Sequence, residues 1–366
     1  MLAGSHAAEP VRPTQPGEGV PVTAVPAARQ TVPVYLTGIG NVQALYSVLV
    51  RARVDGTLDA VAFTEGQEVK KGDLLAVIDP RPYQAALDQA SAQKAKDEAA
   101  LANARLDLER YSRLARSQFA SQQQVDTQKA TVDQLAASIK ADEASMESAG
   151  LNLSFTHIVS PLDGRVGLRL VDPGNLIHAN DTGGLVTVTQ VHPITAVFTL
   201  PEEALPRVIE ARRAGAVKVL AYASDHKTRL SEGELLTPDN AIDPASGTIK
   251  LKARFENADN RLWPGQFIDA RVQVGLLTDA VTVPVASVQR GQDGLFVYVV
   301  KPDSTVALRP VEETLEQDDL AVIAKGVDAG EQVVTNGQSR LADGVRVAAR
   351  APAAPAKPKP AAERPG

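Results

Sequence analysis

The sequence predicts a mainly β chain that is interrupted by a long α-helical coiled-coil hairpin. Three observations lead to this fold class. A pattern of short alternating segments occurs twice, 108 residues apart, at residues 54–80 and 162–189. The segment between the copies, roughly residues 81–153, consists mainly of strong helix formers and lies within a glycine-free stretch from Gly72 to Gly150. At 366 residues, the chain is long enough for several domains, each with its own core.

The two copies of the repeat match in one register. The matched positions are Asp55-Gly56 with Asp163-Gly164, Leu58 with Val166, Gly66 with Gly174, and Asp73 with Asp181. Each copy alternates apolar and polar residues between glycine turns, which is typical of short half-buried strands. Four glycines are expected to be structural turn residues: Gly56, Gly66, Gly164 and Gly174. Gly66 and Gly174 stand where a positive φ is needed. Neither copy can bury a face alone, so together they should form one β-sandwich.

The intervening segment carries two coiled-coil seams. In its first part the seam positions are Leu87, Leu101, Leu108 and Ala115, then Ala90, Ala104 and Tyr111, with Lys94 and Asp97 as breaks. In its second part they are Val125, Val132, Ile139, Met146 and Leu153, then Leu135 and Ala149. This spacing predicts an antiparallel hairpin with its turn near residues 118–121 and arms of about 50 Å. The alternative is a helical pair packed onto another domain, which the narrow seam and the polar flanks disfavour.

Composition excludes several classes of function. A net charge of −6 and a pI near 5.5 disfavour a nucleic-acid binder, and the absence of cysteine removes thiolate chemistry and disulfides. No motif of a nucleotide-binding loop, zinc protease or serine hydrolase occurs. The histidines are scattered without ligand spacing, and the two methionines argue against a soft-metal site but leave a harder metal open. No catalytic residue, metal ligand or cofactor is therefore predicted.

No apolar run approaches the ~18 residues of a spanning helix. The ends of the chain, residues 1–30 and 350–366, are rich in Pro, Ala and Gly and are expected to be disordered linkers. Residues 2–8 could be the remnant of a signal peptide or of a cloned tag. Both origins stay open.

Residues 54–80 also resemble half of a lipoyl or biotinyl carrier domain. Such a domain carries its cofactor on a lysine at an exposed hairpin between the halves. The lysines between Ile78 and Val159 all fall in the predicted helices: Lys94, Lys96, Lys129 and Lys140. A carrier subunit of an enzyme is therefore disfavoured. A purely structural coiled-coil protein is a third class, and it would assemble with itself without a membrane partner.

A lipoyl-like sandwich interrupted by a coiled-coil hairpin resembles the periplasmic adaptors, or membrane fusion proteins of the HlyD/AcrA-like family, of Gram-negative efflux pumps. Residues 192–208 and 248–274 resemble the β-barrel domain of that family, and residues 281–300 and 326–347 its membrane-proximal domain. YLTGIGNV (35–42), RARVDG (51–56) and LVTVTQ (185–190) are most similar to the MdtABC or MuxABC type.

The resemblance implies an elongated chain with a defined order of domains. A lipoyl-like domain is expected from residues 48–80 and 154–190, and the helical hairpin from residues 81–153. The β-barrel should comprise residues 31–47 and 191–276, and the membrane-proximal domain residues 277–349 with part of residues 20–40. In the barrel, Pro264 and Gly265 fit a type II turn, with Trp263 and Phe267 packing beneath it.

The resemblance also implies site residues and partners. The family's tip pattern falls on Arg110, Leu114 and Ser121, which would contact a TolC-like outer-membrane channel. In the alternative interpretation, Leu114 closes the helical seam and Ser121 only caps its helix. The implied function is that of a non-catalytic adaptor in the periplasm at the inner membrane, and the resemblance implies a ring of six copies. It would join an RND transporter to that channel. An ABC exporter or a metal-exporting RND pump is the alternative partner.

Overall fold

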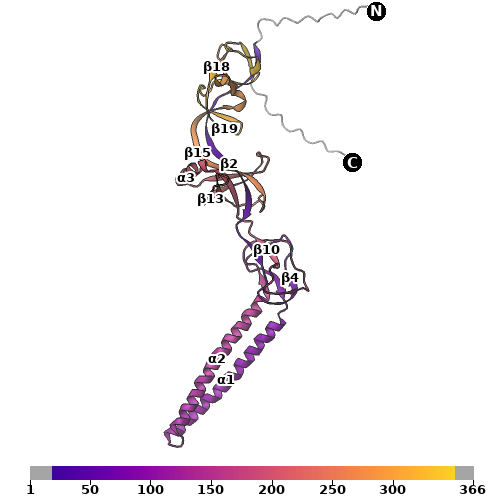
Figure 1. Ribbon diagram of the computed structural model, residues 1–366, viewed down its shortest axis with the longest axis vertical. Coiled ribbons are helices and arrows are strands. Elements are labelled where there is room, and N and C mark those ends of the chain that lie inside the picture. Colours follow the sequence, from indigo (N-terminus) through magenta and orange to yellow (C-terminus); the bar gives the residue numbers. More distant parts are fainter. Residues whose placement is uncertain (1–18, 351–366) are drawn as a thin grey trace, which may run out of the picture. The chain divides into compact units, whose positions relative to one another are not determined.

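The computed structural model describes residues 19–350, which form two compact units (Figure 1). One unit comprises residues 36–272, and the other comprises residues up to 35 together with those from 273 onward. Strands dominate both units, and one pair of long helices interrupts them, so the predicted fold class is confirmed. The expectations for residues 2–8 and for the Pro/Ala tail lie outside the described residues.

The lipoyl-like sandwich consists of two four-stranded sheets. The first has the order β3, β10, β8, β5, with bounds Ser47–Val50, Val186–Thr189, Gly164–Val166 and Glu68–Val69. The second has the order β7, β6, β4, β9, with bounds His157–Val159, Leu74–Ile78, Gly56–Val61 and Leu176–Ile177. Both sheets contain strands from each copy of the repeat. Leu58, Ile78 and Val186 are completely buried in the shared core.

The two copies of the repeat exchange equivalent hydrogen bonds. Gly66 N donates to Val166 O at 3.0 Å, and Gly174 N donates to Leu58 O at 2.7 Å. Two side chains make an equivalent exchange. Asp163 Oδ1 accepts a hydrogen bond from Lys71 N, and Asp55 Oδ1 accepts one from Ala179 N, both at 2.7 Å. Partners in each pair are related by the same offset of 108 residues. The sandwich therefore has an internal two-fold relationship, and neither copy satisfies its backbone without the other.

The hairpin consists of α1 (Arg81–Arg116) and α2 (Gln122–Phe155), which lie side by side (Figure 1). The apolar seam residues expected from the heptads are all buried or half-buried, with Leu101 and Ala104 the most enclosed. Lys94, a break in the apolar seam, forms an ion pair with Glu143 of the facing helix at 3.1 Å. At 1.5 Å per residue the arms are about 50 Å long.

The start of α1 and the end of α2 are attached to the same side of the sandwich by hydrogen bonds. Ile78 N donates to Thr156 O at 2.8 Å, which joins the strand before α1 to the residue after α2. Tyr83 Oη donates to Asp55 O at 2.6 Å, which holds the first turn of α1 against the repeat. Asp79 forms an ion pair with Arg81 at 2.7 Å, and hydrogen bonding to Arg81 lowers the pKa of Asp79 to about 2.

A six-stranded barrel follows the sandwich. Its strands are β2 (Ala28–Ala44), β11 (Ile194–Pro201), β14 (Thr248–Phe255), β13 (Arg229–Asp243), β12 (Lys218–Tyr222) and β15 (Phe267–Pro284). Two of these strands, β2 and β15, continue past the boundary at residues 36 and 272. Each strand pairs with the next, and β15 pairs with both β12 and β2. A short helix, α3 (Leu205–Ala214), follows β11 and the turn η1 (Glu202–Ala204). Phe198, Phe255 and Leu251 fill the barrel core.

The barrel turn differs in part from its expectation. Gly265 has a φ of 85°, which suits the glycine of a type II turn. The two aromatic residues, however, do not pack beneath it, because Trp263 is 51% and Phe267 71% exposed. Trp263 instead lies against the guanidinium of Arg165 from the sandwich, 5.0 Å from the ring centroid. The expectation of a buried aromatic pair is therefore wrong, because a cation–π contact holds Trp263 outside the barrel core.

The second unit corrects the expected N-terminal linker. β1 (Val20–Pro26) pairs with β21 (Gln332–Asn336) and β22 (Val347–Arg350), so the chain is already in a sheet before residue 30. The remaining strands are β16 (Gln289–Gly291), β17 (Gly294–Val300), β18 (Val306–Pro310), β19 (Glu312–Gln317) and β20 (Leu320–Lys325). The connecting turns are η2 (Val285–Ser287) and η3 (Gln338–Arg340). Sequence composition missed β1 because its proline and alanine content resembles that of the preceding linker.

The turn glycines allow a test of the sandwich. Gly66 and Gly174 have φ of 78° and 91°, and a methyl group on either would meet no atom within 4 Å. Replacing either by alanine should therefore cost about 1–2 kcal/mol through backbone strain alone, and thermal denaturation would measure it. Gly183→Ala, where the space is equally open and φ is not positive, should change the melting temperature little. Equal effects at all three positions would contradict this account.

Candidate functional site: the tip of the helical hairpin

The tip joins the end of α1 to the start of α2 through residues 117–121. Arg110 and Leu114 lie four residues apart on α1 and so face the same side of the helix. Arg110 is held by Asp107 of its own helix, with Nη1 and Oδ1 2.7 Å apart, and its side chain remains largely exposed. Leu114 is 39% exposed, so part of its side chain is accessible at the tip while the rest is covered.

Ser121 caps α2 with a complete capping box. Its Oγ accepts a hydrogen bond from Gln124 N at 3.3 Å, and Gln124 Oε1 accepts one from Ser121 N at 3.0 Å. These two bonds satisfy backbone donors that the first turn of a helix leaves unpaired. The capping role considered for Ser121 is thus present, and it occupies the acceptor side of the hydroxyl. Its O–H remains available as a donor to a partner.

The end of α1 is closed by a Schellman motif. Gln118 has a φ of 63°, Gln118 N donates to Ala115 O at 3.0 Å, and Phe119 N donates to Leu114 O at 2.9 Å. The next side chain, Phe119, is 83% exposed. Sequence reasoning did not single out Phe119, although an aromatic residue in the short segment between the two predicted helices was a visible signal. Its exposure depends on the left-handed residue before it, which the sequence QFAS does not reveal.

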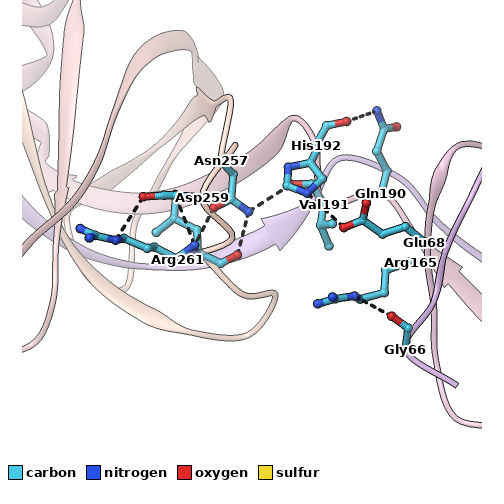
Figure 2. A network of polar contacts seen from close by, with 10 residues as sticks. Gly66, Glu68, Arg165, Gln190, Val191, His192, Asn257, Asp259 and Arg261 are labelled. Carbon is cyan, nitrogen blue, oxygen red and sulfur yellow. Dashed lines mark hydrogen bonds and ion pairs between the residues drawn. The ribbon is translucent and has the colours of Figure 1, made fainter.

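A polar junction connects the sandwich to the barrel (Figure 2). Buried Asn257 donates from Nδ2 to Val191 O at 3.2 Å and to Leu262 O at 2.9 Å, which ties the connecting segment to a barrel loop. His192 Nε2 lies 3.7 Å from Glu68 Oε1 of the sandwich. Arg165 Nε donates to Gly66 O at 2.9 Å while its guanidinium covers Trp263. The sandwich that carries the hairpin is therefore joined to the barrel by several polar contacts.

A carboxyl pair interrupts the seam. Asp97 of α1 and Asp142 of α2 face one another, and Asp142 Oδ2 is buried without a hydrogen-bond partner. Burial raises the pKa of Asp142, the Asp97 carboxyl raises it further, and Lys96 opposes the shift. The ionised carboxyl is thus a cost to the hairpin near neutral pH.

Other chemistry is sparse in the described part of the chain. Residues 19–350 contain no group of three or more His, Asp or Glu side chains that could hold a metal ion. The lysines considered for a carrier role lie within α1 and α2, away from any β-turn: Lys94, Lys96, Lys129 and Lys140. None of the described helices has the length and apolar character that a bilayer-spanning segment requires.

Family models match three consecutive regions of the chain. They are the barrel-sandwich hybrid domain of RND membrane fusion proteins at residues 46–189, their β-barrel domain at residues 193–276, and their C-terminal permuted SH3 domain at residues 279–340. The chain belongs to the RND membrane fusion protein family. Along the chain, the three matched regions correspond to the sandwich with its hairpin, the barrel, and the C-terminal part of the second unit.

Several curated relatives of this membrane fusion protein share one name. The chain is 49% identical to multidrug resistance protein MdtA of Erwinia amylovora over 90% of its own length and 82% of that protein. It is 48% identical to MdtA of Escherichia coli O45:K1 over 90% of its length and 80% of the relative. The resemblance to an RND membrane fusion protein of the MdtA type is confirmed.

Solved structures share the fold. A MacA–MexA chimeric protein with the Pseudomonas aeruginosa MexA α-hairpin domain superposes with a TM-score of 0.51 at 25% identity, covering 84% of this chain and 98% of the chimera. The membrane fusion protein Spr0693 of Streptococcus pneumoniae gives 0.51 at 17% identity over 67% of this chain and 99% of the other. The second likeness concerns the fold alone.

Ser121 can be tested as a cap of this membrane fusion protein. Ser121→Ala removes the side-chain acceptor and should destabilise the hairpin by about 1 kcal/mol, whereas Ser121→Asn retains an acceptor and should cost little. Helix content and melting temperature by circular dichroism would measure both. Equal losses in the two variants would show that the capping box does not stabilise the tip.

The carboxyl pair predicts a pH dependence. Because the pKa of Asp142 is raised in the folded state, the folded hairpin binds the proton more tightly than the unfolded chain does. The contribution of Asp142 to stability should therefore be most favourable below the ordinary carboxyl value of 3.8 and should be lost as pH rises from there through the folded-state pKa. Asp142→Asn should raise the melting temperature at neutral pH and weaken this dependence. Asp133→Asn, at an exposed position of α2, is the control; matching behaviour of both variants would contradict the assignment.

Proposed function

We propose that this membrane fusion protein is the periplasmic adaptor of a tripartite multidrug efflux pump. It links an RND transporter of the inner membrane to a TolC-like channel of the outer membrane. The observation that carries the proposal is the helical hairpin, whose two arms of about 50 Å end in exposed side chains and a rigidly closed loop. Such an arm offers a docking surface far from the domain that supports it.

The relatives support multidrug export as the physiological role. Proteins named multidrug resistance protein MdtA share about half of the residues over 90% of the chain. The adaptor performs no reaction, and the energy for export belongs to the transporter. Its contribution is mechanical: the sandwich and hairpin reach the channel, and the remaining β domains contact the transporter.

The adaptor acts as a ring of copies, which we propose to be a hexamer in the periplasm at the inner membrane. Side-by-side assembly supports this, because a single two-helix rod cannot enclose a path for a substrate. A ring of hairpins can enclose one, and their exposed polar flanks suit contact with neighbouring hairpins and with water.

Arg110, Leu114 and Ser121 contact the channel in this proposal. Leu114 supplies apolar contact, while the guanidinium and the hydroxyl donate hydrogen bonds to carbonyl or carboxylate oxygens of a facing helix. All three lie at the tip, within the last two turns of α1 and the N-cap of α2. The domain boundaries given for the lipoyl-like, barrel and membrane-proximal regions form part of the same proposal.

The tip assignment can be tested in a resistant host that carries the transporter and the channel. Leu114→Asp or Arg110→Asp should remove drug resistance and lower channel affinity at least ~10-fold, because a carboxylate replaces the apolar or cationic contact. Minimum inhibitory concentrations and channel co-purification provide the two measurements. Transporter binding and the melting temperature should stay unchanged, and Asp133→Asn serves as a matched substitution on the hairpin. Full resistance in both Asp variants would remove the tip from the interface.

A further inference from the structure

The tip has a charge distribution opposite to that of the whole chain. Residues 110–125 contain three arginines, Arg110, Arg113 and Arg116, and no acidic residue, whereas the net charge of the chain is −6. Arg110 is neutralised by Asp107, and Arg113 has only a long contact of 3.9 Å with Glu109. Arg116 forms no ion pair with any residue in the described range. The outermost turn of α1 therefore presents unneutralised positive charge.

An exposed apolar side chain follows these arginines in the loop of the tip. At 83%, Phe119 has the highest exposed fraction among the large apolar side chains of residues 19–350. It directly follows the left-handed Gln118, and its backbone N–H is bonded to Leu114 O. Two residues later the capping box of Ser121 begins. The ring is thus exposed, although hydrogen bonds on both sides fix the backbone that carries it.

This arrangement suits an anchor residue. A ring that is presented on a fixed backbone loses little chain entropy when it is buried by a partner. Aromatic and arginine side chains together are the residue types that most often carry binding energy at protein interfaces. Leu114, which shares a backbone hydrogen bond with Phe119, extends the apolar surface.

We propose that Phe119 is the apolar anchor of the hairpin and inserts between helices of the outer-membrane channel, where carboxylates at the rim pair with Arg113 and Arg116. This inference rests on the proposed function and names the chemistry of the partner surface. Charge supports it, since adjacent hairpins in a ring bring like-charged tips together. Carboxylates on the partner relieve that repulsion.

A lipid surface fits the tip less well. Binding to a bilayer interface needs a broad apolar face on an amphipathic helix. The tip offers only Phe119 and Leu114, and amides surround them at four positions: Gln118, Gln122, Gln123 and Gln124. Amide side chains suit hydrogen bonding with a facing helix, so a protein partner is favoured.

The test uses the full-length adaptor and the purified TolC-type channel of the same bacterium in detergent. Phe119→Ala should weaken channel binding about 10- to 100-fold, mainly through faster dissociation, while Phe119→Trp retains most of the affinity. The double variant Arg113→Gln/Arg116→Gln should slow association and reduce the salt dependence of binding. Biolayer interferometry at several salt concentrations separates these effects.

Leu151→Ala is the matched control, because Leu151 is 54% exposed on the same hairpin but close to its base. It should bind the channel like the wild type. If Phe119→Ala binds the channel as tightly as the wild type does, Phe119 is not the anchor, and the adaptor function is unaffected by that result. No wild-type binding to the channel, combined with unaltered drug resistance when the channel is deleted, overturns the adaptor function itself. A third outcome also overturns the proposal. If the wild type binds vesicles with anionic headgroups, and Phe119→Ala abolishes this binding without changing channel binding, the ring contacts a membrane.

Discussion

The reciprocal hydrogen bonding between the two copies of the repeat is the constraint on which the rest of the hairpin-bearing unit depends. Gly66 and Gly174 each donate to a strand of the opposite copy, and Asp55 and Asp163 exchange equivalent bonds. Because each copy satisfies the backbone of the other, the sandwich forms only when both ends of the helical insertion have come together. Closing so long an insertion carries an entropic cost that grows only slowly with length, so the two-copy sandwich can hold a long arm.

The hairpin depends on its ends more than on its own core. Only Leu101 and Ala104 are buried along two helices of 36 and 34 residues. The seam also contains the Lys94–Glu143 ion pair and the buried carboxyl of Asp142. Isolated helices with so little buried surface are marginal in water. The helix pair is therefore stabilised at both ends. The sandwich holds one end, and the Schellman motif and the capping box close the other.

That division of roles matches the proposed adaptor. A rod with polar flanks can lie beside other copies without a large exposed apolar patch, while the apolar side chains Leu114 and Phe119 gather at its end. The closed loop presents both on an ordered backbone. The family models match almost the whole described chain, whereas the contact surface that we propose is confined to a few residues of the tip.

The sequence by itself determined the repeat, the helical insertion and its seam, because alternation, heptad spacing and glycine placement are local patterns that survive without tertiary information. It also located the turn between the helices. Only the tertiary structure decided where Trp263 lies, since its indole contacts Arg165, which is distant in sequence, through a cation–π interaction outside the barrel core. It likewise showed that residues 20–26 form a strand, because that strand depends on partners near residues 332 and 347. The exposure of Phe119 required the left-handed conformation of Gln118, a backbone state that non-glycine residues adopt rarely and that sequence patterns do not encode.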